Sequence, residues 1–459
     1  MKNFFINGLF SIKNNKYIMK FLCNLDYDFK LVIYKDIEKN EVMTEYIETK
    51  PELKSKLKPL NVEINYPINQ LGYKRFYYDV INLQTNTIEY IGSFPIISPN
   101  YNKNLKIFFL SCNDNTEKSE PWNTYQDRIS SKLWKKINKN ILTTPFDIII
   151  HMGDQIYADS VGQLWLDGKI DKKQVKEYLE TLYINTYSEK EQSNVMRNVL
   201  NFNMFDDHDV KDCWGTPSTQ NNPNNKKFDT YKNIAMEYIK NYQLSLMDID
   251  FNDNKDYSYF VDIGKYKFLL IDMRTQFYYT GQIFTDKIIN WTYKNLCSNP
   301  KKHNFIILPR PIGGTGKYYS LLSGMYIKDA YDEPLHPHNI KQTQKFVKLL
   351  FKFKLKTQNK IKILAGDVHE CYKKTITHNY KNKKYSITQY ISSAITRSCR
   401  ANDSNPIVLS LMKFSDNFNT LCLNGIGKKK YHSRYNNYGE IVNNKIKFYT
   451  IKEKNVTKK

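Results

Sequence analysis

Five continuous apolar runs constrain the fold of this chain more than any other feature of its sequence. They are LKIFFLSC (105–112), FDIIIHMGD (146–154), KFLLIDMR (267–274), NFIILPR (304–310) and KIKILAGDVH (360–369). Strands without an apolar–polar alternation are buried on both faces, as in a parallel sheet covered by helices. Segments of helical period separate several of the runs, for example residues 233–247 and 343–354. The sequence therefore predicts an α/β domain.

Polar side chains stand where these runs end. Cys112 closes the first run, Asp154 and Tyr157 follow the second, and Asp367 and His369 follow the fifth. In open α/β sheets, the residues just beyond the carboxyl ends of the strands line the ligand crevice. A thiolate, carboxylates, a phenolate and an imidazole together suit a transition metal beside a harder, oxygen-bound cation. Carboxylates this dense would repel one another without a metal, so the sequence predicts a metal site.

Shorter strand-like runs precede this region. They are KYIMKFLCNL (16–25), FKLVIYKDI (29–37), KRFYYDVINL (74–83) and TIEYIGSFPII (87–97). Divided by polar residues and glycine, they predict a small β-sandwich-like domain over residues 1–100, and Pro95, Pro99 and NYNKN (100–104) indicate a linker. Residues 104–400 form the predicted α/β domain, in which TQNNPNNKKFD (219–229) is expected to be a loop. Residues 401–459 form a predicted extension with a hairpin at 435–451 and a basic tail.

The chain is strongly basic, with a formal net charge of +23. Such a charge would favour polyanions by counterion release. The chain is also rich in Lys, Asn, Ile, Tyr and Phe, whose codons are rich in A and T. Composition bias is therefore the preferred explanation, with a nucleic-acid surface at residues 379–385 and 427–435 as the alternative. The amphipathic segment 345–354 is interpreted as a solvated helix face rather than a membrane or RNA contact.

Cysteine usage and the N-terminal residues bear on the compartment. Seven cysteines, without a CxxC pair, do not form a disulfide framework, so a reducing compartment is expected. The first sixteen residues contain an apolar run that Asn7 and Gly8 interrupt, which makes a poor signal peptide. Because no run reaches about 18 apolar residues, no membrane span is predicted. These features favour an intracellular, cytoplasmic location.

Taken in order along the chain, the strand-end motifs resemble one known family. HMGDQIYAD (151–159), DDHD (206–209) and GDVH (366–369), with LSC (110–112) and IDMR (271–274), resemble the PhoD-like phosphatase/phosphodiesterase family of calcineurin-like metallophosphoesterases. The resemblance spans roughly residues 104–400. It implies a four-layer α/β/β/α sandwich preceded by a small β domain. It also implies hydrolysis of phosphoric esters by a metal-bound hydroxide at a dinuclear site.

The resemblance further implies which residues bind the metals. Asp154 takes the place of the bridging aspartate, Tyr157 and Cys112 match the iron ligands of this branch, and Asp207 matches the second-metal ligand. The superfamily's first motif, DxH, is absent from FFLSC, as expected for this branch. The implied cofactors are Fe³⁺ and a harder divalent cation, with Ca²⁺ as the expected choice. The full predicted ligand set is Cys112, Asp154, Tyr157, Asp207, Asp367 and His369, with Asp212 as a further oxygen ligand.

Three further residues receive catalytic roles from the resemblance. His208 matches the histidine that protonates the leaving group, and Asp209 is expected to orient it. Arg274 matches an arginine common in the family, which either binds substrate phosphate or forms a structural ion pair. Two alternatives to a small-ester hydrolase remain: a nuclease-like phosphodiesterase that acts on nucleic acid, and a non-catalytic polyanion-binding relative. The intact ligand set argues against the second.

Overall fold

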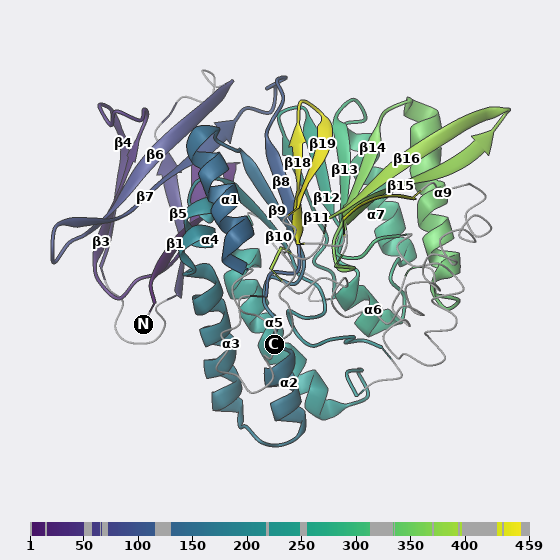
Figure 1. The fold of residues 1–459 in the computed structure, drawn as a ribbon, viewed down its shortest axis with the longest axis horizontal. Coiled ribbons are helices and arrows are strands. Elements are labelled where there is room, and N and C mark those ends of the chain that lie inside the picture. The colour runs from purple at the N-terminus through teal and green to yellow at the C-terminus, as the bar shows by residue number, and fades with distance from the viewer. Residues whose placement is uncertain are drawn as a thin grey trace, which may run out of the picture.

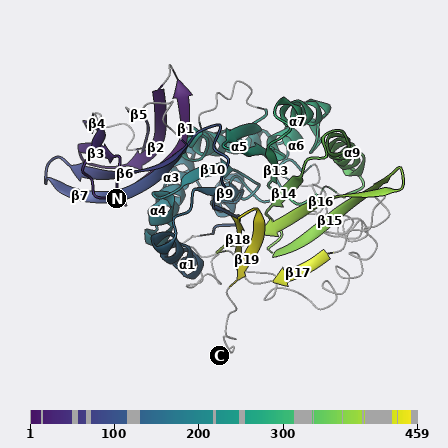
Figure 2. The ribbon, with the colours of Figure 1, turned by 90° about the horizontal axis from the view of Figure 1, so that it is seen from above.

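The computed structural model shows a β-rich N-terminal part followed by a larger sandwich of sheets and helices (Figure 1). Seen from above, the N-terminal sheets lie at one end of the molecule and the helix α9 (Ile340–Thr357) lies at the other (Figure 2). The structure describes residues 2–13, 16–49, 57–64, 66, 72–114, 130–216, 220–247, 255–312, 334, 336–369, 371–392, 395–396, 429–433 and 436–450.

The N-terminal part consists of two antiparallel sheets with an aromatic core between them. One sheet has the order β1-β2-β5 and the other β4-β3-β6-β7. Phe21 in the first sheet makes edge-to-face contacts with Tyr78 and Phe94 in the second, at centroid distances of 5.4 and 5.8 Å. The predicted β-rich N-terminal region is confirmed. Its strands are β1 (Phe4–Lys13), β2 (Lys16–Asn24), β3 (Phe29–Tyr34), β4 (Val42–Glu48), β5 (Leu57–Ile64), β6 (Tyr73–Asn82) and β7 (Thr87–Ile97).

The polar interruption of the first apolar run has a structural reason. The pairing of β1 with β2 shifts register after Asn7, which is the signature of a β-bulge. The buried side-chain amide of Asn7 donates hydrogen bonds to the backbone carbonyls of Ser93, Arg197 and Val199, at 2.9, 2.8 and 3.1 Å. Two of these carbonyls belong to the larger sandwich, so the bulge fastens the N-terminal part to it.

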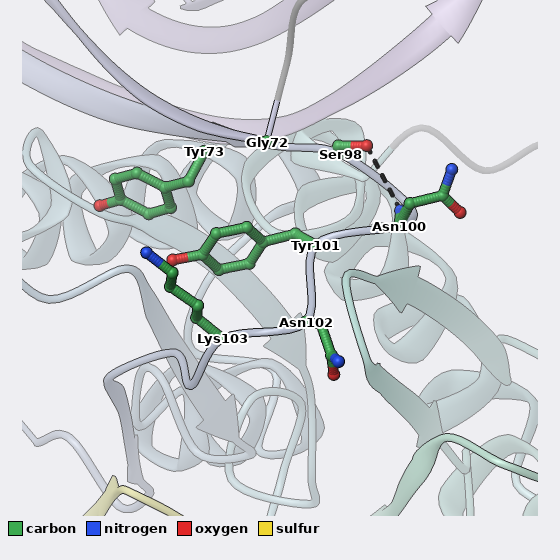
Figure 3. A pocket seen from close by; sticks show the side chains of 7 residues that line it. All are labelled: Gly72, Tyr73, Ser98, Asn100, Tyr101, Asn102 and Lys103. Carbon is green, nitrogen blue, oxygen red and sulfur yellow. Dashed lines mark hydrogen bonds between the residues drawn. The ribbon is translucent and has the colours of Figure 1, made fainter.

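The segment that joins the two parts lies against the start of β6. Pro95 belongs to β7, an edge strand, where a residue without an N–H is tolerated. The chain then turns, and a pocket of about 600 Å³ opens beside the turn. In this pocket the Tyr101 ring lies between Tyr73 and Lys103 (Figure 3), and the two tyrosine rings are 5.5 Å apart. The predicted linker therefore packs on the N-terminal part.

The larger part is built on two sheets whose central strands are parallel. The first has the order β10-β9-β8-β18-β19 and the second β11-β12-β13-β14-β16-β15-β17. β10, β9 and β8 run parallel, as do β12, β13, β14 and β16. The strands are β8 (Ile107–Leu110), β9 (Ile148–Met152), β10 (Leu200–Met204), β11 (Tyr259–Ile263), β12 (Tyr266–Leu270), β13 (His303–Leu308), β14 (Ile361–Ala365), β15 (Cys371–Tyr380), β16 (Lys383–Ser392), β17 (Lys429–Ser433), β18 (Asn437–Val442) and β19 (Lys445–Thr450).

The burial of both sheet faces explains why each run is apolar throughout. Successive side chains of a strand point to opposite faces, so Phe109 belongs to the core between the sheets and Phe108 to the core under the outer helices. Across the inner core, the rings of Phe202 and Phe268 meet edge to face at 5.3 Å. Residues of α1 and α4 cover the outer face of the first sheet, and residues of α7 and α9 cover that of the second. The predicted α/β/β/α layering is confirmed.

The predicted periodic segment 343–354 lies within α9, whereas the segment 233–247 is divided between α5, which ends at Tyr242, and the 3-10 helix that follows it. The predicted loop 219–229 ends in the first turn of α5, because the Asn225 side chain accepts the N–H groups of Lys227 and Phe228 and so caps the helix. No helix within the described ranges is both long and apolar enough to cross a membrane. The helices are α1 (Ser130–Thr143), α2 (Asp159–Leu166), α3 (Lys172–Tyr187), α4 (Lys190–Met196), α5 (Lys226–Tyr242), the 3-10 helix η2 (Leu244–Leu246), α6 (Arg274–Thr280), α7 (Asp286–Ser298) and α9.

The residues after 400 contribute to both sheets. The predicted terminal hairpin is present as β18 and β19, and β18 pairs antiparallel with β8 in the first sheet. β17 pairs with β15 in the second sheet. The predicted basic tail lies outside the described residues. The predicted C-terminal extension thus supplies strands to the sandwich itself.

Candidate dinuclear metal centre

Strands from both sheets end at one site. The centre lies at the seam of the sandwich, because Asp154 and Asp207 belong to the first sheet and Asp367 to the second. One carboxylate oxygen from each of these three residues and from Asp206 lies within 4.8 Å of the others. The strand-end residues are Cys112 after β8, Asp154 after β9, Asp207 after β10, Arg310 after β13 and Asp367 after β14.

Each of two Gly-Asp pairs needs its glycine for close packing at this seam. Gly153 has φ +100°, and a Cβ there would lie 2.6 Å from Cβ of Asp206. A Cβ on Gly366 would lie 2.5 Å from the Ser111 hydroxyl oxygen, which belongs to the other sheet. The glycines therefore let the two sheets approach and bring the following aspartates together.

Four of the predicted ligands have left-handed backbone conformations. Their φ angles are +56° at Cys112, +53° at Asp154, +66° at Asp367 and +50° at His369. Residues other than glycine rarely adopt such angles, and those that do cluster at functional sites where the surrounding structure holds them in place. The backbone of the centre is therefore held in an unfavourable conformation that aims these side chains.

Asp209 organises this backbone, and this corrects the expectation that it orients His208. Its buried carboxylate is surrounded by donors from the loops after β9 and β10 and from Gln243 at the end of α5. None of the hydrogen bonds found for it within the described residues involves the imidazole. Oδ2 of Asp209 accepts hydrogen bonds from the backbone N–H groups of Asp154 and Asp206, at 2.9 Å each. Oδ1 accepts hydrogen bonds from the backbone N–H groups of Gln155 (3.0 Å) and Ile156 (3.2 Å) and from the side-chain amide of Gln243 (2.9 Å).

The softer donors gather on one side of the centre. The Cys112 thiol is buried in contact with Tyr157 and lies 3.3 Å from Oδ2 of Asp154. The Tyr157 hydroxyl lies 3.5 Å from Nε2 of His369. The thiol thus lies beside the central carboxylate, Tyr157 beside the cysteine, and the imidazole beside the phenol.

The burial of Asp154 indicates a missing positive charge. Its Oδ1 has no accessible surface and makes no hydrogen bond within the described part of the chain. Burial, together with the carboxylates of Asp206 and Asp207, raises the pKa of Asp154 well above its ordinary value. A buried carboxylate oxygen without a partner is strongly unfavourable unless a cation satisfies it. The residues present therefore fit a metal, and Asp154 lies in two of the three groups that could hold one.

Two arginines flank Asp207. Its Oδ1 lies 3.0 Å from Nη2 of Arg274, and its Oδ2 lies 3.0 Å from Nη2 of Arg310. Although burial opposes the charge, the two guanidinium groups hold the pKa of Asp207 below its usual range. Nε of Arg274 bonds Asp206, and Nε of Arg310 lies 3.5 Å from Oδ2 of Asp367. Arg274 therefore forms structural ion pairs with Asp206 and Asp207, which is one of its two expected roles.

His208 is held by Asp159 and by a stacked ring. Nδ1 of the imidazole lies 2.8 Å from Oδ2 of Asp159, and the ring stacks on Tyr157 at a centroid distance of 4.4 Å. Nε2 is 4.0 Å from Oδ1 of Asp212. Burial would lower the pKa of His208, but the carboxylates of Asp159 and Asp207 outweigh burial and raise it well above the ordinary value. The side chain is 20 % exposed, so the imidazole borders the centre.

Four residues near the site were not among the predicted ones, and one of them, Asp206, directly precedes Asp207 in the sequence. Asp159 follows Tyr157 by two positions, but its partnership with His208 depends on how the loop after β9 folds. Arg310 ends an apolar run just as Arg274 does, so the strand-end rule could have identified it. Cys213 forms a third possible metal-binding group with Asp207 and Asp212. The side chain of Asp212 is half-exposed and lies at the rim of the site. The remaining predicted ligands come together.

Comparisons with known proteins agree with this geometry. The sequence model of the PhoD-like phosphatase family matches residues 122–288. A solved structure of PhoD is similar to this chain at a TM-score of 0.66 and 13% identity, covering 95% of this chain and 83% of that one. A purple acid phosphatase from yellow lupin (Lupinus luteus) seeds is similar at a TM-score of 0.56 and 11% identity, covering 98% and 72%.

No curated protein sequence matches the chain significantly. The family match includes the Asp154, Asp207 and His208 segments, and the two solved structures share the fold in which these segments meet. Residues 122–288 are therefore similar to the PhoD-like phosphatase family, the chain shares the fold of PhoD and of a purple acid phosphatase, and together with the acidic cluster these findings support a metal-dependent phosphoric ester hydrolase.

Proposed function

We propose that the protein hydrolyses small phosphoric esters with Fe³⁺ and a second, divalent cation, preferably Ca²⁺, bound at this centre. One observation carries the proposal. Four carboxylates meet within 4.8 Å, and the buried Oδ1 of Asp154 makes no hydrogen bond within the described residues. Cations are the usual solution for so many buried acidic groups.

The donor types divide the centre into two sides. Cys112, Tyr157 and His369 supply sulfur, phenolic oxygen and nitrogen, which suit iron better than calcium. Asp207 and Asp212 supply oxygen, which suits a hard divalent cation. Asp154 lies 3.3 Å from the Cys112 sulfur and within 4.8 Å of Asp207, so its carboxylate is placed to serve both sides. When bound, such a metal pair lowers the pKa of water and neutralises charge on the phosphoryl oxygens.

His208 is the candidate proton donor to the departing alkoxide. Its elevated pKa keeps the imidazole protonated near neutral pH. Asp159 fixes the ring through Nδ1, which leaves Nε2 without a hydrogen bond to Asp212 at their separation of 4.0 Å. A positioned general acid contributes about 10²–10⁴ in rate. We assign Asp159 as the residue that positions this acid.

The arginines serve the centre as positioning residues. Arg274 and Arg310 contact Asp207 from both sides, and Arg310 also approaches Asp367 in the other sheet. Fixed guanidinium groups limit the directions in which a carboxylate can turn. Their charges also offset those of the carboxylates, which favours an anionic ester at the centre.

A metal and substrate test decides the proposal. Protein purified without chelators is analysed for iron and calcium and assayed with p-nitrophenyl phosphate and bis(p-nitrophenyl) phosphate. We expect bound iron, a visible charge-transfer band and hydrolysis of at least one ester. Chelation should abolish turnover, and iron with calcium should restore it. Protein that holds no iron, or that hydrolyses neither ester when both metals are supplied, would overturn the proposal.

A further inference from the structure

The outer helix α9 carries a continuous stripe of lysines. Lys341, Lys345, Lys348, Lys352 and Lys356 recur every three or four residues, and all five are exposed. Residues with this spacing lie on one face of a helix. The opposite face, which includes Phe346 and Leu350, is buried in the core under the second sheet. α9 contains no acidic residue.

The tip of the β15–β16 hairpin extends this stripe. Lys381, Lys383 and Lys384 at the tip are exposed, and α9 lies beside the hairpin in both views (Figures 1 and 2). The contact is direct, because Nζ of Lys354 donates a hydrogen bond of 2.6 Å to the carbonyl oxygen of Ser386. We define the basic face as Lys348, Lys352, Lys356, Lys381, Lys383 and Lys384.

A third segment adds lysine positions on the far side of the hairpin. The antiparallel register of β15 and β17 sets Lys373 opposite Lys430 and Lys374 opposite Lys429. β15 and β17 (Lys429–Ser433), which are distant in the sequence, are neighbouring strands of one sheet. These lysine positions lie at the opposite end of β15 from the hairpin tip, so they are not counted in the basic face.

Composition bias explains many lysines but not this arrangement. No acidic residue occurs at positions 340–366 or 371–392. In α3, by contrast, Lys173 lies 3.8 Å from Glu177, and Lys176 lies 3.6 Å from Glu237. In α9, Lys345 lies 3.3 Å from Asp286. Like charges at i, i+4 destabilise a helix, so the part of the stripe formed by Lys348, Lys352 and Lys356 works against stability. An anionic ligand would compensate for it.

The basic face lies away from the metal centre. The centre is at the carboxyl ends of the parallel strands, where Asp367 follows β14. β16 runs parallel to β14 and pairs Thr388 with Lys362, so its first residues extend beyond the opposite end of β14. The hairpin tip and the C-terminal half of α9 are at that opposite end. A ligand bound there is not at the reacting bond.

The chemistry of the face favours a phosphate polymer over a lipid surface. Among the described residues from 336 to 392, no large hydrophobic side chain is exposed, whereas membrane-surface helices insert apolar side chains. Lys352 also lies 5.2 Å from the centroid of the Tyr293 ring. We propose that the basic face binds the phosphate backbone of single-stranded nucleic acid, without base specificity. This proposal does not depend on the metal content of the centre.

Salt-dependent binding with matched charge variants tests it. The full chain is titrated into fluorescein-labelled oligouridylate across a salt series, and binding is followed by anisotropy. Lys348, Lys352 and Lys356 are replaced together by Gln in one variant. The control replaces Lys132, Lys135 and Lys139, three exposed lysines of α1. Both variants lower the formal net charge of +23 by three, so only the position of the lost charge differs.

We expect the α9 variant to bind more weakly. The plot of log K against log salt should also become less steep by about 2, because each of the three lost phosphate contacts contributes about 0.7 to the slope. The α1 variant should keep the wild-type slope. The thermal unfolding temperature of the α9 variant should be no lower than that of the wild type, because the repulsion between the lysines is relieved. Equal losses in both variants would overturn the proposal, as would wild-type protein that binds phosphatidylserine vesicles but not the oligonucleotide.

Discussion

Replacing Asp209 by asparagine tests whether this residue holds the loop of the metal centre or acts in catalysis. The carboxylate accepts five hydrogen bonds, two on Oδ2 and three on Oδ1, and four of the donors are backbone N–H groups. Asparagine keeps only one acceptor oxygen and replaces the other by an amino group. Whichever way the amide turns, at least two buried N–H groups lose their acceptor and face another donor.

The expected effect follows from the number of orphaned donors. Leaving a buried donor without a partner costs about 1–3 kcal/mol. With two donors orphaned, we expect Asp209→Asn to lower the free energy of unfolding by about 2–6 kcal/mol. The least damaging orientation affects the N–H groups of Asp154 and Asp206, so the left-handed backbone at Asp154 should also lose its support. Metal content should therefore fall together with stability.

The assay is denaturant unfolding in the presence of a chelator, which removes metal binding from the stability comparison, followed by metal analysis of untreated protein. Asp171→Asn is the matched control, because Asp171 caps α3 by accepting the N–H of Gln174 at 2.8 Å and asparagine caps equally well. An Asp209→Asn protein with wild-type stability and metal content but no turnover would refute this reasoning. It would restore the role of orienting His208 that the family resemblance implies.

Four further changes should separate the roles within the centre. Asp154→Asn should lose both metals by elemental analysis, because one carboxylate serves both sides; retention of either metal at full occupancy contradicts this. His208→Ala should keep both metals and lose about 10²–10⁴ in turnover on an ester with a poor leaving group; unchanged turnover rules out the proton-donor role. Tyr157→Phe should remove or strongly shift the visible band, and an unaltered spectrum would exclude phenolate ligation. Burial lowers the pKa of His151 to about 4, so the unfolded state takes up the proton first as the pH falls from 6.5 to 4. Over this range the free energy of unfolding of the wild type should fall by about 3 kcal/mol relative to that of His151→Gln. Parallel pH profiles of the two proteins in denaturant unfolding would refute this.

The positions of the predicted ligands followed from one general rule. Parallel strands end at the same edge of a sheet, so Cys112 and Asp154 could be placed together from the apolar runs that precede them. Asp367 follows a strand of the second sheet, so its meeting with them depends on how the two sheets pack. The same rule applied to the run 304–310 identifies Arg310. The layers were also predictable, because runs without an apolar–polar alternation require cover on both faces.

The partners of individual side chains could not be predicted in the same way. His208 is followed in sequence by Asp209, but its hydrogen-bond partner is Asp159, which lies 49 residues away. The loop after β9 must first turn around the Asp209 carboxylate before Asp159 can reach the imidazole. Likewise, Lys373 and Lys430 become neighbours only through the pairing of β15 with β17. Such choices depend on loop conformation and strand register, which periodicity does not determine.

The pairing of β18 with β8 also determines when the first sheet can be completed during synthesis. β8 supplies the strand that leads to Cys112, yet one of its two neighbours begins at Asn437. Until that segment leaves the ribosome, the hydrogen-bonding edge of β8 has no partner from β18. Contacts between residues so distant in the chain form late because loop closure opposes them. Completion of the first sheet at Cys112 is therefore a late event of folding, and the nascent chain must protect an open strand edge until then.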